Sequence, residues 1–290
     1  MLLKNLKFLP FYLLSLLPLP CLYVFSDMTF FMSYYIFKYR RKVVRLNLEN
    51  AFPNKTKSEI IRIEKAFYHH FSDVIFEMLK TLTISKKTVF KRLSIKNNAL
   101  IKGFFEQKRD IIMYGAHYSN WEWGILLPLF LTHKTTTFYQ KLSNKYINEL
   151  MQLIRKRFGM LCVESKQGYK TLAKLRQENI LTINYIVGDQ NPKRNSSKYW
   201  TKFLNQETAF LIGADRIAKK MNQVVVFPLF KKLKRGIYEL EFILIDDNTI
   251  VAKGDEIIEK YVRVLENQIK KTPELWLWSH RRWKLKKPQE

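Results

Sequence analysis

A histidine and a glutamate five residues apart are the first residues in this chain whose types and spacing suggest chemistry. His117 and Glu122 lie in the stretch DIIMYGAHYSNWEWG, which covers residues 110–124. An imidazole that is held by a carboxylate at one nitrogen can take a proton from a hydroxyl with the other, so the pair predicts a general base and its orienting acid. Five residues on one continuous helix would turn the two side chains roughly 140° apart, at about 3.6 residues per turn. His117 must therefore precede the helix that carries Glu122.

A structural interpretation of the same residues is also open. Ser119 stands three residues before Glu122, which is the spacing of a capping box, and in that role the glutamate only closes a helix N-terminus. Both interpretations predict a buried strand over residues 111–114, close backbone approach at Gly115, and a helix over residues 121–130. In open α/β sheets, ligands bind at the C-terminal ends of the strands, where His117 would lie.

A second polar group follows another apolar run. Gly188-Asp189-Gln190 comes directly after a strand predicted for residues 180–187, so Asp189 can contribute to the crevice of His117, or can cap the loop as an Asx-turn. A polar loop with Lys193 and Arg194 comes next, and its cations can hold phosphates.

The rest of the chain alternates between the two kinds of element. Strands are predicted over 135–139, 160–163, 223–230 and 237–245, and helices over 144–158, 169–177, 208–220 and 255–270. The strand over 237–245 has the alternation of a half-exposed edge. Residues 45–102 predict a helical lead-in with a turn or cap at 54–58. This order favours an α/β fold with a mostly parallel central sheet flanked by helices.

Composition limits the kinds of partner and cofactor. The 51 Lys and Arg residues outnumber 25 Asp and Glu residues, and the net charge of +26 favours a polyanionic partner such as nucleic acid, anionic lipid, a phosphorylated substrate or an acidic carrier protein. The two cysteines, Cys21 and Cys162, provide no disulfide framework, and Cys162 fits packing within a strand. His69 and His70 have no metal-ligand spacing to other His or Cys residues. We expect neither a metal nor a bound cofactor.

The N-terminal segment is apolar enough to bind a membrane. Residues 8–26 carry no charge, and a second uncharged run covers residues 28–37. Three prolines, at positions 10, 18 and 20, argue against a straight span, so the segment is predicted to be a spanning, broken or interfacial anchor. It does not resemble a cleaved signal peptide. The cations that follow it favour a cytoplasmic body that contacts anionic lipid, whereas the alternative is a solvated basic stretch. We therefore divide the chain into an anchor, 1–37, and a catalytic domain, 38–290.

Four stretches together resemble one enzyme family. They are KYRRKVVRLNLENAFPN at 38–54, HYSNWEW at 117–123, GDQ at 188–190 and LWLWSHRRWK at 275–284. In this order, behind an apolar N-terminus, they resemble the lipid A biosynthesis acyltransferases, the late lauroyl or myristoyl transferases of Gram-negative bacteria. The histidine-x4-acid element is shared with glycerolipid acyltransferases, whereas the GDQ and HRRWK elements are more specific to the lipid A family.

The resemblance implies an activity and a location. It implies an acyltransferase at the cytoplasmic face of the inner membrane that moves a fatty acyl chain from acyl carrier protein to a hydroxyl of an acylated glucosamine disaccharide. Acyl carrier protein, the glycolipid and the anionic membrane are then its partners, nucleic acid is not, and no cofactor is needed beyond the acyl donor. His117 would be the general base and Glu122 its orienting acid.

Substrate binding is the role that the resemblance implies for several further residues. Many members have a Tyr-Arg pair after the strand that follows the catalytic helix, but this chain has Tyr139-Gln140-Lys141. Either Lys141 supplies that charge or the function lies at Arg155 or Arg157. The remaining expected substrate-binding residues are Asp189, Lys193, Arg194, Arg281 and Arg282.

Two other functions stay open from the sequence. One is acyl transfer to a different lipid, such as a glycosylated phosphoinositide or a lysophospholipid. The other is a membrane-tethered protein without enzymatic activity that binds polyanions, although the chain has no recognisable nucleic-acid-reading motif and this function would leave HYSNWE unexplained.

Overall fold

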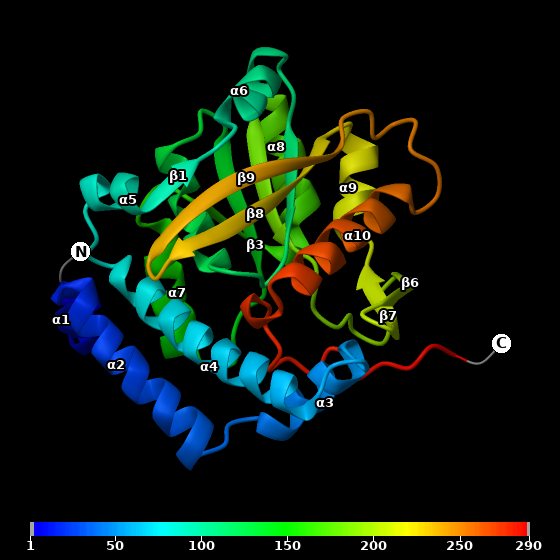
Figure 1. Ribbon diagram of the computed structural model, residues 1–290. Helices are drawn as coiled ribbons and strands as arrows, with labels where there is room; N and C mark the ends of the chain where they lie inside the picture. Colours follow the sequence, from blue (N-terminus) through cyan, green and yellow to red (C-terminus); the bar gives the residue numbers. More distant parts are fainter. Residues whose placement is uncertain (1–2, 289–290) are drawn as a thin grey trace.

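A seven-stranded mixed sheet forms the centre of the molecule (Figure 1). The computed structural model describes the backbone of residues 3–288 and the side chains of residues 6–288. Residues 1, 2, 289 and 290, the side chain of Lys4 and the start of the expected anchor lie outside this described part. The strands of the sheet are β1 (Leu93–Ile95), β2 (Ile111–Gly115), β3 (Lys134–Tyr139), β4 (Leu161–Glu164), β5 (Thr182–Val187), β8 (Val224–Lys234) and β9 (Ile237–Asp246).

Most of the sheet is parallel, as predicted. The spatial order is β1-β9-β8-β2-β5-β3-β4, and the run β8-β2-β5-β3-β4 is parallel throughout. The β8 and β9 strands form an antiparallel hairpin, and β1 pairs in parallel with β9. The five parallel strands therefore bring their C-terminal ends, and the loops that follow them, to one edge of the sheet.

The helices cover both faces of this sheet. They are α3 (Arg41–Ala51), α4 (Lys57–Lys80), α5 (Lys86–Arg92), α6 (Asn98–Glu106), α7 (Lys145–Lys156), α8 (Gly168–Gln177), α9 (Gly213–Met221) and α10 (Glu256–Lys271). Short 3₁₀ segments are η3 (Trp121–Leu129), η4 (Ser165–Gln167) and η5 (Pro273–Leu275). The helix expected over residues 121–130 is thus a 3₁₀ helix, and it contains Pro128.

Strand β2 divides two hydrophobic cores because successive side chains of a strand point to opposite faces. Ile112 and Tyr114 belong to the core that contains α9 and α10, whereas Ile111 and Met113 belong to the core that contains η3 and α7. All five residues of β2 are buried. The strand is therefore fixed on both sides, and its last residue, Gly115, presents the catalytic loop from a rigid base.

The lead-in over residues 45–102 is mostly helical, with one exception. Its longest helix, α4, begins with a capping box in which Thr56 and Glu59 each accept a hydrogen bond from the other's backbone N–H, as the predicted turn at 54–58 requires. Residues 93–95 form strand β1 instead of helix. Because β1 covers the outer side of β9, the prediction of β9 as an edge strand was wrong.

The segment after the GDQ sequence was also predicted incorrectly. Residues 208–211, expected as helix, belong to β7 (Gln206–Leu211), which pairs antiparallel with β6 (Lys198–Phe203) in a small separate sheet. Aromatic and β-branched residues in both segments favour this hairpin. Its two-residue turn, Leu204-Asn205, has positive φ at both positions, as a type I′ turn requires. Only residues 213–220 of the expected helix are helical.

The N-terminal apolar segment folds back as a bent arm along α4. We use "N-terminal arm" for residues 6–37, which include most of the first four elements: the short helices η1 (Leu3–Phe8) and α1 (Leu9–Leu16), then α2 (Leu19–Phe31) and the π-helical turn η2 (Met32–Ile36). No single helix in the described residues has the length and apolar character to cross a membrane. The stretches Leu6–Leu16 and Leu19–Ile36 meet those criteria only together, and their axes differ by 105°.

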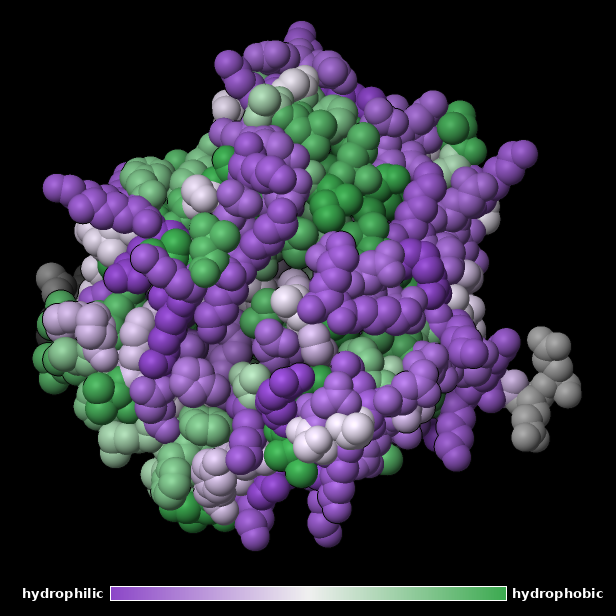
Figure 2. All heavy atoms as spheres, in the orientation of Figure 1, coloured by the Kyte–Doolittle hydropathy of each residue, from purple (hydrophilic) through white to green (hydrophobic). Residues whose placement is uncertain are grey.

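Figure 2 shows apolar side chains gathered at the lower left of the molecule, where Figure 1 places α1 and α2.

Candidate active site

Two neighbouring strands bring the two predicted polar groups together. Strands β2 and β5 are hydrogen-bonded in parallel, with Gly115 opposite Val187, so the loops that begin at residues 116 and 188 leave the sheet side by side. The amide of Gly188 donates a hydrogen bond to the carbonyl of Gly115 at 3.1 Å. This register places His117 and Asp189 at the same level above the sheet.

Asp189 is the carboxylate that holds the imidazole of His117. Its Oδ1 lies 2.7 Å from Nδ1 of His117, and its Oδ2 accepts the backbone N–H of His117 at 3.0 Å. The same Oδ2 accepts the indole N–H of Trp276 at 2.8 Å. Sequence analysis gave the orienting role to Glu122 and a substrate-binding role to Asp189. In the structure Asp189, and not Glu122, makes the direct bonds to the imidazole.

The ion pair sets the charge of both partners. Burial lowers the pKa of His117, but the adjacent Asp189 carboxylate outweighs burial and leaves that pKa above its ordinary value. Burial raises the pKa of Asp189, yet the charge of His117 and the three hydrogen bonds bring it below its ordinary value. Asp189 is therefore ionised at neutral pH and accepts the proton on Nδ1 of His117, so the neutral imidazole carries its lone pair on Nε2.

The lone pair on Nε2 of His117 already accepts a hydrogen bond in the structure. The side-chain amide nitrogen of Gln190 lies 3.0 Å from Nε2 of His117. An amide nitrogen can only donate, which agrees with a neutral imidazole whose Nε2 accepts. A substrate hydroxyl that binds to Nε2 must displace this amide, so Gln190 occupies the position that a reacting hydroxyl would take.

Glu122 lies near the imidazole without bonding to it. Its Oε1 accepts the indole N–H of Trp121 at 3.1 Å, and the Trp121 ring packs edge-on against His117 with centroids 5.4 Å apart. Glu122 still raises the pKa of His117 through its charge, and Arg155 lowers that pKa. Both residues are thus part of the electrostatic surroundings of His117.

The predicted capping box does not form. Asn120, rather than Ser119, is the N-cap of η3, since its side chain accepts the amide of Trp123 at 3.3 Å. Ser119 has φ of +55°, a left-handed conformation that makes a sharp turn between His117 and the helix. Its amide donates to the carbonyl of Leu275. The turn allows His117 to precede the helix, as the spacing argument requires.

The C-terminal segment lies along this turn like an added strand. Tyr118 forms an isolated antiparallel bridge with Trp276, and the amide of Leu277 donates to the carbonyl of His117. Further on, Nε2 of His280 accepts the amide of Asn191 at 3.1 Å. Burial lowers the pKa of His280 to about 4, so this ring is neutral and can accept. The segment from Trp276 to His280 therefore ties the two catalytic loops together.

Glycines permit the tight packing beneath the site. The ring of Tyr185 lies between Gly115 and Gly124, where a Cβ atom would come within 2.4 Å and 2.3 Å of the ring respectively. The ring of Tyr114 covers Gly188, where a Cβ atom would lie at 2.2 Å. Any side chain at these three positions would push a buried tyrosine out of place. The close approach predicted at Gly115 is confirmed.

The predicted substrate-binding cations differ in the bonds that they make and in their exposure. Arg157 donates both terminal nitrogens to the carbonyls of Thr81 and Ile84, so it clamps the end of α4 and does not reach His117. Of the two arginine alternatives, only Arg155 influences His117. Lys141 is exposed and pairs with Glu164 at 3.0 Å.

The remaining cations differ in exposure. Lys193, Arg194 and Arg281 are exposed near the two loops in the chain. Arg282 is only 1% exposed, donates to the carbonyl of Ala209 and lies over the ring of Phe210 at 4.4 Å. The guanidinium of Arg282 lies inside the protein in this structure, so its role in substrate binding stays a prediction that this geometry does not favour.

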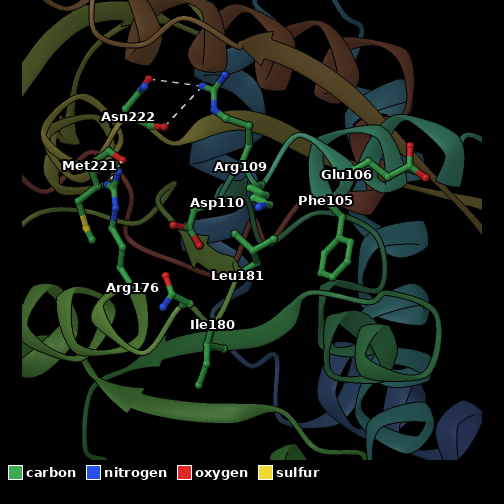
Figure 3. Close-up of a pocket in the computed structure, with 11 residues that line it drawn as sticks. Phe105, Glu106, Arg109, Asp110, Arg176, Ile180, Leu181, Met221 and Asn222 are labelled. Carbon is green, nitrogen blue, oxygen red and sulfur yellow. Dashed lines mark hydrogen bonds between the residues drawn. The ribbon is translucent and has the colours of Figure 1, made fainter.

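A cavity and a cluster of ionisable side chains lie elsewhere in the described residues. A cavity of about 710 Å³ lies at the N-terminal ends of β2, β5 and β8, the opposite edge of the sheet from His117 (Figure 3). Its arginines are engaged with protein oxygens: Arg109 donates to Asn222, and Arg176 donates to the carbonyl of Met221.

Asp27, His69 and Asp73 also come together, on α2 and α4. However, the guanidinium of Arg235 bonds to both of these carboxylates and occupies the space that a metal ion would need. Neither cluster matches the chemistry of the His117 site.

Comparison with known families decides the identity of the chain. A sequence model of the bacterial lipid A biosynthesis acyltransferases matches residues 6–285, almost the whole chain. The chain belongs to this family. The recognition from its motifs is thereby confirmed, and the chain is an acyltransferase of lipid A biosynthesis. A search of curated protein sequences found no significant match.

Proposed function

We propose that this lipid A acyltransferase moves a fatty acyl chain from acyl carrier protein to a free hydroxyl of an already acylated glucosamine disaccharide. The reaction would belong to the late stage of lipid A assembly, at the cytoplasmic face of the inner membrane of a Gram-negative cell. The contact between His117 and Asp189 carries this proposal, because it holds the proton on Nδ1 and leaves Nε2, which accepts the Gln190 amide in the structure, as the nitrogen that can act as the base.

The chemistry needs only a base and a positioned hydroxyl. The acceptor hydroxyl displaces Gln190 and donates to Nε2 of His117, and its oxygen attacks the thioester carbonyl carbon as the proton moves to the imidazole. The bond from carbon to sulfur then breaks, and the imidazolium returns the proton to the departing thiolate. A thioester is already reactive, so no covalent acyl-enzyme is required.

Asp189 makes this proton transfer favourable. It is buried and ionised, and it holds Nδ1 of His117 so that only Nε2 can act as the base. As His117 takes the proton it becomes a cation, and the adjacent carboxylate stabilises that charge in a low-dielectric surrounding. The Trp276 indole fixes the second carboxylate oxygen, so the carboxylate cannot rotate away.

The charges around the site fit the two substrates. Lys193 and Arg194 lie three and four residues after Gln190, and Arg281 follows His280, so all three place exposed positive charge beside the catalytic loops. We assign them to the phosphates of the glycolipid or to the acidic surface of acyl carrier protein. Lys141, at the end of β3, and Arg155 on α7 would add charge on the Glu122 side.

The N-terminal arm would hold the site next to the glycolipid at the membrane surface. Its outer face exposes large apolar side chains, among them Leu13, Val24, Met28, Phe31 and Phe37, which are each 54–69% exposed. Its inner face is buried on the protein, where Ser26 is bonded to Asp73. A helix packed in this way cannot cross a bilayer, so we propose that only the outer face enters the cytoplasmic leaflet.

The acceptor can be tested in cells. Mass spectrometry of lipid A from cells that lack this chain should show one acyl chain fewer, and the wild-type gene should restore it, whereas a His117→Ala gene should not. An unchanged acyl count would contradict the lipid A assignment. A change in glycosylated phosphoinositide or lysophospholipid acylation instead would identify the alternative acceptor.

A further inference from the structure

A buried glutamate lies behind the catalytic turn and belongs to none of the motifs. Glu77, on α4, is completely buried, and three donors surround its carboxylate. Oε2 accepts the amide of Asn120 at 2.6 Å and the hydroxyl of Tyr238 at 2.8 Å, while Oε1 accepts the hydroxyl of Tyr23 at 2.9 Å. Asn120 belongs to the catalytic turn, Tyr238 to β9 and Tyr23 to the N-terminal arm.

The bond to Asn120 is the one that reaches the active site. Asn120 is fully buried, and both ends of its side chain are used: the nitrogen donates to Glu77, and the oxygen caps η3 through the amide of Trp123. His117 lies three residues before Asn120, and Glu122 lies two residues after it. The direction of the Asn120 side chain therefore sets where the turn ends and where the helix with Glu122 begins.

The bond to Tyr23 connects the same carboxylate to the N-terminal arm. Tyr23 is on α2, between Leu22, which is completely buried, and Val24, which is 59% exposed. The guanidinium of Arg235 lies over the ring of Tyr23, 4.3 Å from the ring centroid. A shift of α2 against α4 would move this hydroxyl away from Glu77, and the carboxylate would then be free to turn toward its other donors.

We propose that Glu77 is a positioning residue. It holds the catalytic turn in its active geometry and links this geometry to the position of the N-terminal arm against α4. The inference rests on the proposed function of His117. Glu77 does not touch the substrate; it acts through Asn120. Burial raises the pKa of Glu77 to about 7. Three donors hold its carboxyl group in place, and a displacement of about 1 Å at a reacting group can lower a rate about 10²-fold, so the link is strong enough to matter.

Glu77→Gln tests the role directly. One carboxyl oxygen becomes an NH₂ group, which cannot accept, so the donor that faces it must reorient or lose its bond, and the side chain can no longer carry a negative charge. We expect kcat for acyl transfer from acyl carrier protein to fall about 10²-fold with KM nearly unchanged, because the substrates do not contact this residue. Glu64→Gln is the matched control: Glu64 is also completely buried on α4, but it pairs with Arg41 and Arg45, away from the catalytic turn.

The control separates positioning from stability. Both variants should lower Tm, but only Glu77→Gln should lower kcat. Equal losses of kcat in the two folded variants would overturn the proposal. Failure of His117→Ala to lower activity would instead overturn the proposed function, so the two failures are distinguishable.

Tyr23→Phe tests the link between Glu77 and the N-terminal arm. This test is possible even if the Glu77→Gln variant does not fold. This change removes one donor and keeps the ring, and we expect a smaller fall in kcat than for Glu77→Gln. Tyr35→Phe, in an exposed position of the same arm with no bond to Glu77, should have no effect. In a Glu77→Gln background that folds, Tyr23→Phe should have no further effect. A Tyr23→Phe enzyme with wild-type kcat would overturn the link.

Discussion

Oδ1 of Asp189 lies 2.7 Å from Nδ1 of His117, although the two residues belong to loops that follow different strands. The contact exists because β2 and β5 are adjacent and in register, and because Gly188 bonds to Gly115 where the strands end. A carboxylate in this position fixes the tautomer of the imidazole, raises its pKa and stabilises its cation during the reaction. Activity should therefore depend on Asp189 in a way that pH can reveal.

Asp189→Asn should change both the rate and its pH dependence. The base works only when neutral, so activity falls as pH drops through the pKa of His117, which Asp189 holds above its ordinary value. Without that charge the pKa falls, and the acid limb of kcat/KM should move to lower pH. The plateau should also fall, by a factor on the order of 10² to 10⁴, because the tautomer is no longer held.

Glu122→Gln is the comparison for that experiment. Glu122 acts on His117 through charge alone, so its variant should shift the acid limb in the same direction but by less. A larger shift for Glu122→Gln than for Asp189→Asn would return the orienting role to Glu122.

Gln190→Ala should shift the limb in the opposite direction. The Gln190 amide donates to Nε2, which favours the neutral imidazole, so its removal should raise the pKa of His117. The acid limb of kcat/KM would then move to higher pH. Profiles measured side by side for the Gln190→Ala and Asp189→Asn enzymes check the sign, and shifts in the same direction would contradict the bonding described here.

Arg282→Lys should affect stability rather than substrate binding. Arg282 is buried, and its guanidinium donates to the carbonyl of Ala209 and lies over the Phe210 ring. A lysine has no guanidinium and cannot make both contacts. We expect a loss of about 1–3 kcal/mol in the free energy of unfolding, with KM for the lipid unchanged. Arg281→Ala, at an exposed position, should raise KM for the lipid and leave the free energy of unfolding unchanged. Denaturant titration and steady-state kinetics on both variants test this, and an Arg282→Lys enzyme of normal stability but raised KM would refute it.

Phe31→Asp should weaken membrane binding. Burying one large apolar side chain contributes roughly 1.5–3 kcal/mol, so partition to anionic vesicles should fall by about tenfold or more. Val251→Asp is the control, because Val251 is 65% exposed but lies outside the arm, in the loop before α10. Co-sedimentation with the vesicles measures both. Equal binding of Phe31→Asp and the wild type would exclude the outer face of the arm as the contact.

The sequence predicts the parts of the site better than their assembly. Strand β2, its glycine and the loop position of His117 follow from apolar runs and spacing, and they are confirmed. The partner of His117 does not follow, because the order of strands in the sheet is not encoded in local patterns. Only the adjacency of β2 and β5 brings Asp189 to the imidazole. The nearer acid, Glu122, therefore seemed the natural partner.

The same limit explains the other differences. Trp276 and His280 reach the site through a tertiary contact of the C-terminal segment, which no local pattern in the sequence predicts. Arg282 is buried beside an exposed arginine of identical type, which sequence cannot distinguish. The β6–β7 hairpin was obscured by its lysines, although Tyr199, Trp200 and Phe210 are strong strand formers.

The proposed function makes His117 the base in acyl transfer to a lipid A precursor. The single-turnover rate of acyl transfer from acyl carrier protein to that precursor, with purified wild type and His117→Ala in the same vesicles, tests this role. We expect a fall of about 10² to 10⁴-fold in the variant, with an unchanged Tm and unchanged vesicle binding. A folded, membrane-bound His117→Ala protein that transfers acyl chains at the wild-type rate would contradict it.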